Sequence, residues 1–316
     1  MGEEKIELST HVVLKIMQHC NECVPEFVSG QLFGLDVENT LEVTDCFPFM
    51  SSVNDDQEYS KHQYDMMRCL RDVNVDNNVA GWYQSANFGT FQTIELVDSF
   101  VSYSDTYNKS VCIVYDPQLS SFGNIAMKAY RLKPSLLELA KERKYAASDV
   151  LKAGVSWRNL FVEIPVVIKD SALAQAMILN LKVDTARAAV GKSLPYTPAD
   201  VEYSPESSIS PFLVKNATLL MECIEDLQIE QQRVTQHHSN VARQAQQQAV
   251  WLQKRRAENV ARRQAGEEPL PEEEPTLFKP IVEPSQLDNF LVCHQLNTYC
   301  EHINVAAKQA MDRLLI

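Results

Sequence analysis

The sequence has 316 residues, of which 45% are hydrophobic, so it is long enough for one substantial domain and a further region. A net charge of −13 argues against electrostatic capture of nucleic acid over the whole surface, so only local contacts with RNA remain open. No secretion signal and no apolar run of about 18 residues is present, so we expect a cytoplasmic protein without membrane contact.

Residues 1–182 alternate strand-like and helix-like segments with short connections, a pattern typical of an α/β or α+β domain. Strands are predicted at residues 27–34, 40–47, 79–84, 111–115 and 161–168. Helices are predicted between them, including residues 59–72, 91–103 and 135–152. We therefore expect one globular domain over residues 1–182.

Cysteines and histidines occur in two groups that resemble metal-binding sets. These are Cys20 and Cys23, a CxxC pair beside His19, and the looser set of Cys293, His294 and Cys300. Residues 10–22 carry apolar side chains at helical spacing, and no second CxxC follows. The spacing of Cys293, His294 and Cys300 on a helix would not direct their side chains to one metal ion. Helix packing is therefore favoured over zinc, and the eight cysteines are expected to be reduced thiols.

A long helix is predicted after a linker at residues 183–211, which is rich in proline and polar residues. Residues 212–265 contain neither glycine nor proline, and apolar residues recur about every 3.5 positions. The seam residues expected to bind partner helices are Leu213, Leu220, Ile224, Leu227, Val234 and Val241. At about 1.5 Å per residue the helix would exceed the width of its own domain, so other helices must cover it.

The C-terminal end is predicted to be an extended spacer followed by a docking helix. Residues 266–286 contain five prolines and six glutamates, which favours an extended chain. Residues 287–316 return to helix, with an apolar stripe that includes Leu296, Tyr299, Ile303, Met311 and Leu314. Two interpretations stay open: the helix docks on a partner, or it folds back on residues 212–240 as a hairpin.

Residues 80–100 (AGWYQSANFGTFQTIELVDSF) are the most informative segment. They resemble the zinc-binding segment of the MPN domain, the fold of metal-dependent deubiquitinating enzymes. In active members, two histidines and an aspartate bind zinc, and a glutamate on an earlier strand takes a proton from the zinc-bound water. The resemblance thus implies an MPN fold and provides positions at which catalytic residues can be checked.

None of the expected ligands stands at these positions. The two histidine positions hold Gln84 and Ala86, the serine and aspartate positions hold Ile94 and Val97, and the glutamate position holds Phe27. Asp98 is one residue late, which rotates a helical side chain by about 100°, and Glu26 is expected on the opposite strand face. We therefore expect no zinc, no other cofactor and no enzymatic activity.

Further segments resemble the H subunits of eukaryotic translation initiation factor 3. They are residues 45–49 (DCFPF), 113–117 (IVYDP), 127–132 (MKAYRL), 163–169 (EIPVVIK), 266–274 (GEEPLPEEE), 277–280 (LFKP) and 296–300 (LNTYC). These matches occur in order over nearly the whole chain. One departure is Met50, where that family usually has proline, and it affects only the conformation of a loop.

This resemblance implies a non-catalytic scaffold subunit. Such subunits pair with the MPN-domain F subunit and join a helical bundle with PCI-domain subunits. The complex then acts with the 40S ribosomal subunit and mRNA in the preinitiation complex. The alternatives are an MPN-type scaffold of the proteasome lid or signalosome, and a helix-mediated RNA-binding protein.

The RNA alternative depends on a local basic region near the end of the long helix. Its residues are Arg243, Lys254, Arg255, Arg256, Arg262 and Arg263. Contacts with mRNA or rRNA would be made there, although a solvated charged face explains the same pattern. Trp251 is the aromatic residue among these charges, whereas single-strand binding usually requires several.

Overall fold

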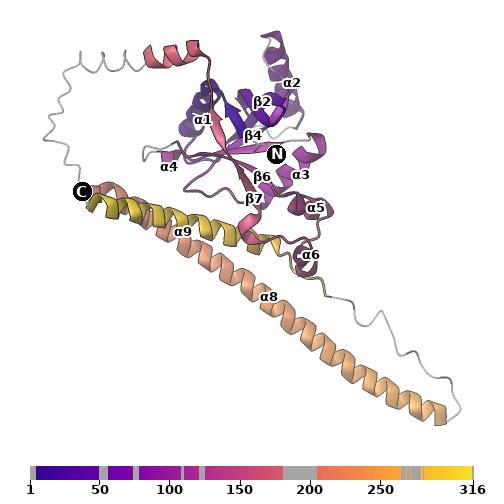
Figure 1. Ribbon diagram of the computed structural model, residues 1–316. Helices are drawn as coiled ribbons and strands as arrows, with labels where there is room; N and C mark the ends of the chain where they lie inside the picture. The colour runs from indigo at the N-terminus through magenta and orange to yellow at the C-terminus, as the bar shows by residue number, and fades with distance from the viewer. Residues whose placement is uncertain are drawn as a thin grey trace.

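An eight-stranded mixed sheet forms the centre of the N-terminal domain in this computed structural model (Figure 1). The structure describes residues 5–49, 56–73, 78–107, 110–120, 125–180, 205–264, 268, 271, 279 and 281–314. The strands are β1 Lys5–Leu8, β2 Ser29–Val37, β3 Thr40–Pro48, β4 Val79–Ser85, β5 Val111–Tyr115, β6 Met127–Leu132, β7 Phe161–Ile164 and β8 Val166–Ile168. Their order is β7-β6-β5-β4-β2-β3-β1-β8, so β4 and β2 lie at the centre of the sheet.

The two end strands of this sheet are neighbours in the sequence. β7 pairs with β6 and β8 pairs with β1, and Pro165 alone separates them. The carbonyl of Pro165 accepts a hydrogen bond of 3.0 Å from the Ile6 backbone N–H. The predicted strand at 161–168 is therefore two short strands that bring the edges of the sheet together, because proline has no N–H for a continuous ladder.

Helices cover both faces of the sheet. On one face α1 Thr10–Glu22 buries Val12, Ile16 and Cys20 against β-strand side chains. On the other face lie α3 Ile94–Thr106, α5 Pro134–Glu142 and α6 Ala147–Lys152, around Trp82 and Phe100. The domain also contains α2 Asp56–Asp72, α4 Pro117–Ser120 and the 3-10 helix η1 Trp157–Asn159. Residues 172–180 are also helical.

Two predicted helices differ in extent from the observed ones. The helix predicted at 91–103 begins at Ile94, because the Thr93 hydroxyl caps it by accepting from the Leu96 N–H. The helix predicted at 135–152 is interrupted, because Arg143 adopts a left-handed conformation with φ of 51°. The predicted α/β class of the domain is otherwise confirmed.

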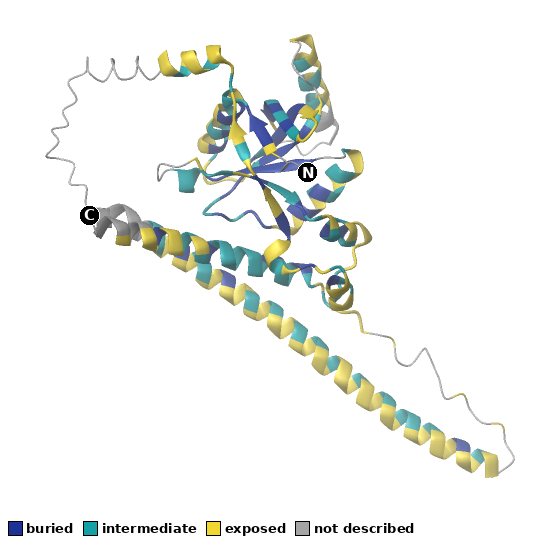
Figure 2. Cartoon of the chain, in the orientation of Figure 1, coloured by how far each residue is buried: buried dark blue, intermediate teal, exposed yellow. Residues whose placement is uncertain are grey.

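Two long helices follow the domain: α8 Pro205–Gln264 and α9 Leu287–Leu314. α8 begins within the predicted linker, whose residues 183–204 lie outside the described residues. α9 packs along the first part of α8 and also against the domain, whereas the far part of α8 extends well beyond both (Figures 1 and 2). No described helix is both long enough and apolar enough to cross a membrane.

Candidate functional site

The positions that correspond to zinc ligands lie in and beside the hydrophobic core. Gln84 is half-buried in β4, between Ser29 of β2 and Val114 of β5. Ala86 and Val97 are both buried in the core cluster that contains Trp82 and Phe100. Two of the positions therefore carry apolar side chains with no donor atom for a metal.

The α3 positions follow the helix geometry expected from the sequence. Ile94 is exposed at the first turn of α3, and Val97 is fully buried one turn later. Asp98 is exposed, so its carboxylate lies on a different side of the helix from Val97. The rotation of about 100° per residue explains this difference.

The expectation for residues 26 and 27 requires a correction. β2 begins only at Ser29, so Glu26 and Phe27 lie in the preceding loop and the strand-face argument does not apply to them. Glu26 donates its backbone N–H to the Cys23 carbonyl at 2.7 Å, and the Phe27 side chain is 64% exposed. Both residues line the same shallow pocket.

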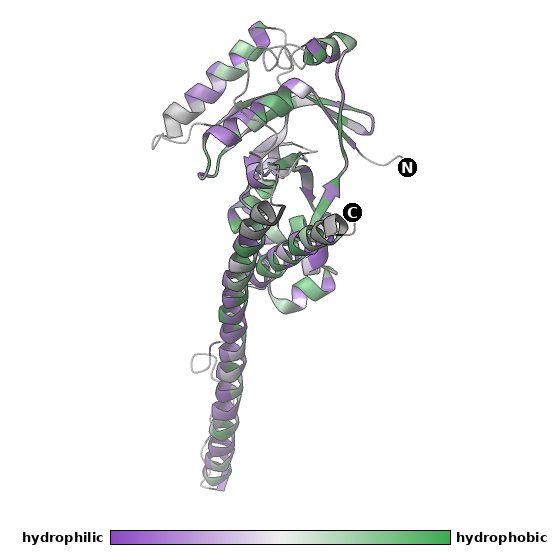
Figure 3. Cartoon of the chain, turned by 90° about the vertical axis from the view of Figure 1, so that its left-hand side faces the viewer, coloured by the Kyte–Doolittle hydropathy of each residue, from purple (hydrophilic) through white to green (hydrophobic). Residues whose placement is uncertain are grey.

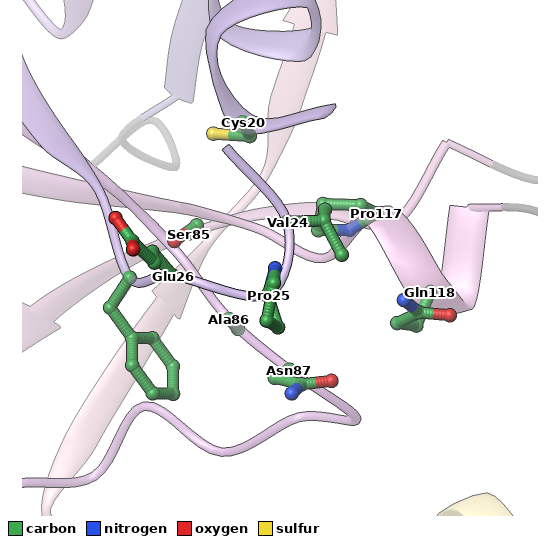
Figure 4. A pocket seen from close by; sticks show the side chains of 10 residues that line it. Cys20, Val24, Pro25, Glu26, Ser85, Ala86, Asn87, Pro117 and Gln118 are labelled. Carbon is green, nitrogen blue, oxygen red and sulfur yellow. The ribbon is translucent and has the colours of Figure 1, made fainter. Parts of the chain in front are cut away.

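Two of the positions expected to be degenerate, Phe27 and Ala86, line this pocket (Figure 4). Cys20, Val24, Pro25 and Glu26 form one side, and the segment from Ser85 to Asn87 forms the other, with Pro117 and Gln118 at the edge. The Ser85 hydroxyl accepts from the Val28 N–H at 2.8 Å. Among the described residues, no group of three or more His, Cys, Asp or Glu side chains is placed to hold a metal ion.

The CxxC pair lies on α1 and at its end, as the helical spacing predicts. Cys20 is buried, and this burial raises the pKa of its thiol to about 12, so it is a poor nucleophile and metal ligand at neutral pH. The neighbouring His19 makes a hydrogen bond of 3.0 Å through Nδ1 with the Tyr83 hydroxyl. Burial also lowers the pKa of His19. These contacts support helix packing at this site.

The residues predicted for assembly are divided between covered and exposed surfaces of the two helices. Half-buried are Leu213, Leu220, Leu227, Val234, Leu296 and Ile303, whereas Ile224, Val241 and Met311 are exposed. Tyr299 is 1% exposed. The Leu314 side chain lies outside the described residues.

The C-terminal helix is already docked within the chain. The Tyr299 hydroxyl hydrogen-bonds the Thr90 hydroxyl, and the Cys223 thiol of α8 lies 3.4 Å from the Val292 carbonyl. At its start, Leu287 and Leu291 are buried in the same core cluster as Val97. The fold-back interpretation thus describes α9 better than an uncovered docking helix does, and the domain itself is a second surface that the sequence analysis missed.

A signal for this contact exists in the sequence. Leu287, Phe290 and Leu291 recur at helical spacing just before the predicted stripe, and all three belong to or pack against the domain core. They were not among the predicted assembly residues.

The basic residues near the end of α8 surround the helix. Lys254, Arg255 and Arg256 are consecutive, so they point about 100° apart. The Arg255 guanidinium lies 5.0 Å from the centre of the Trp251 ring and 3.8 Å from the Glu258 carboxylate. Arg243 bonds the Asn240 side chain at 3.1 Å, while Arg262 is half-buried and Arg263 is exposed. The six side chains do not form one continuous basic face.

Comparison with known proteins covers both parts of the chain. A family profile described as "C-terminal region of eIF3h" matches residues 120–316, and one described as "JAB1/Mov34/MPN/PAD-1 ubiquitin protease" matches residues 2–107. A relative in Arabidopsis thaliana, the H subunit of eukaryotic translation initiation factor 3, is 43% identical over 98% of this chain and 91% of its own. Relatives of the same name in Xenopus laevis and Bombyx mori are 37% identical over 99% and 96% of this chain, and 92% and 88% of theirs. The resemblance seen in the sequence is thus confirmed, and the chain belongs to the family of H subunits of eukaryotic translation initiation factor 3.

Proposed function

We propose that this chain is a non-catalytic scaffold subunit of initiation factor 3, which acts in the cytoplasm during assembly of the preinitiation complex on the 40S subunit and in mRNA recruitment. Its MPN domain pairs with the F subunit, and its long helices join a bundle with PCI-domain subunits. The names of its relatives over nearly their full length favour this complex over the proteasome lid or the signalosome.

The composition of the degenerate site supports a role without catalysis. Zinc hydrolysis requires ligands that hold the metal and a base that accepts the proton of its water. Ala86 and Val97 provide neither, and both are packed in the core. A partner subunit would therefore gain no strong ligand from these positions.

The observation that carries the scaffold proposal is the uncovered apolar face of α8. Val214 and Met221 are 62% and 64% exposed. They are two turns apart and so share one face of α8. Figure 3 shows hydrophobic positions recurring along the long helix. Asn216 and Cys223 share a different face of α8, which is buried, and the Cys223 thiol contacts the Val292 carbonyl of α9. A partner helix on the first face would complete the burial of α8.

The proposal is tested by substitution of this face in the full-length chain. We expect Val214→Glu with Met221→Glu to reduce capture of the PCI-domain subunits and the 40S subunit from a eukaryotic lysate, while the F subunit is retained. Burial of each side chain contributes about 1.5–3 kcal/mol, so the double variant should bind at least about 100-fold more weakly. Removal of both helices would be a poorer test, because Leu291 belongs to the domain core.

The matched control places the same charges on exposed apolar residues elsewhere. Leu151 and Val282 are 80% and 88% exposed, so Leu151→Glu with Val282→Glu should leave capture unchanged. Undiminished capture by the α8 variant would contradict the role of this face. Failure of the unsubstituted chain to recover initiation factor subunits would contradict the scaffold proposal as a whole.

A further inference from the structure

A cavity of about 430 Å³ separates the second half of α9 from the sheet. Its aromatic wall contains Phe91 and Tyr130, whose rings are stacked at 4.8 Å, together with Phe161. Its other wall is formed by α9, with His294 and His302 among the lining residues. The helix therefore rests on the domain at this point without filling the space beneath it.

The two halves of α9 are held by different interactions. The first half is anchored by Leu287 and Leu291, which are buried in the domain core. The second half buries the Tyr299 side chain, which is 1% exposed, and makes polar contacts: Gln92 donates to the Thr298 hydroxyl at 3.4 Å, and the Tyr299 hydroxyl meets Thr90. Burial of leucine stabilises by about 1.5–3 kcal/mol per side chain, whereas a neutral hydrogen bond adds about 1 kcal/mol. The second half thus depends more on polar contacts than the first half does.

Each histidine in this half has one nitrogen in an unfavourable position. Nδ1 of His294 and Nδ1 of His302 are buried and have no hydrogen-bond partner among the described residues. The His294 ring packs edge-on to Phe161 at 5.4 Å, and the His302 ring lies over Gly89. A neutral imidazole leaves an unsatisfied acceptor there, but a protonated one would bury a charged donor without a partner, which is far more costly.

The charged groups that line the cavity do not provide such a partner. They are Lys128 on β6, Glu163 on β7, Arg158 on η1, Asp116 after β5 and Glu301 on α9. Lys128 and Glu163 bond each other at 3.1 Å, and Asp116 accepts the Gly89 N–H at 2.6 Å. Burial lowers the pKa of both histidines; Lys128 lowers that of His302 further, while Glu301 opposes both shifts.

We infer that docking of the second half of α9 on the MPN domain is proton-sensitive: protonation of His294 and His302 releases residues 294–306 from the sheet, while Leu287 and Leu291 stay anchored. A histidine whose pKa is lowered in the docked state stabilises docking above its free pKa of about 6.5, and this contribution is lost as the pH falls below that value. The contact is a device of this chain alone and does not depend on the scaffold role.

Hydrogen exchange on the purified full-length chain tests the inference. Protection of residues 294–306 is compared at pH 7.5 and pH 5.5, after correction for the intrinsic rates. If a histidine binds no proton in the docked state, the equilibrium constant for docking falls about tenfold at pH 5.5. The two histidines together therefore lower the protection of residues 294–306 by up to about 100-fold. Protection of α1 and of residues 287–291 should stay unchanged.

Substitution distinguishes the pH effect of the two histidines from that of Asp116 and other groups that bind protons. In His294→Gln with His302→Gln, which keeps neutral polar side chains, we expect the pH-dependent loss to disappear. The control is His238→Gln on α8, an exposed position where the loss should persist. The inference is overturned if the unsubstituted chain shows no excess loss in residues 294–306 relative to 287–291, or if the double variant retains it. Neither outcome bears on capture of initiation factor subunits.

Discussion

Leu291→Ala should release α9 from the domain, because Leu291 is one of the buried apolar anchors of this helix. The side chain is 4% exposed and belongs to the cluster that contains Trp82, Phe91 and Phe161. Truncation of a buried leucine to alanine destabilises by about 2–5 kcal/mol through lost burial and the cavity left behind. We take about 3 kcal/mol, which corresponds to roughly 100-fold weaker docking.

Hydrogen exchange over residues 287–306 reports this docking directly, since opening of α9 does not require the sheet to unfold. The control is Met311→Ala on the same helix, where the side chain is 63% exposed and a change below about 0.5 kcal/mol is expected. If Leu291→Ala reduces protection no more than Met311→Ala does, then α9 is not anchored on the domain. The description of α9 as packed against both α8 and the domain would then be wrong.

Three further predictions follow from the site. Gly89→Ala should lower the protection of α9 more than Gly154→Ala does: both glycines have positive φ, but an added Cβ at Gly89 would lie 2.5 Å from the His302 ring, whereas at Gly154 nothing lies within 4 Å. Metal analysis of the purified chain should find zinc far below one atom per chain, and a stoichiometric value would refute the inert site. Lys254→Glu with Arg263→Glu should leave binding of a single-stranded RNA oligonucleotide unchanged; a large loss with a steep salt dependence would restore the RNA hypothesis.

The strongly patterned elements could be predicted from the sequence. β5 is a continuous apolar run, and α8 repeats its apolar positions over many turns, so the sequence pattern identifies both. β1 and β6 were missed for a physical reason. β1 has only four residues, too few for its alternation of polar and apolar residues to identify a strand, and β6 carries Lys128 and Arg131 at exposed or half-exposed positions.

The position of α9 could not be predicted from apolar periodicity alone. Its contact with the domain beyond Leu291 is made by histidine, threonine and tyrosine side chains, which hydrophobicity does not distinguish from a solvated face. The degenerate metal positions show the opposite case. The sequence motif singled out Ala86 and Val97, but only the structure shows that both are part of the core.

Closure of the sheet at Pro165 also constrains the order of folding during synthesis. β1 is made first, yet one of its two neighbours is β8, and Thr10 after β1 bonds Asp170 across a separation of 160 residues. Such distant pairing is slow because a long loop must be closed before any contact forms. The N-terminal strand must therefore remain half-paired until the last strand leaves the ribosome, and during that interval it is exposed to chaperones and to aggregation.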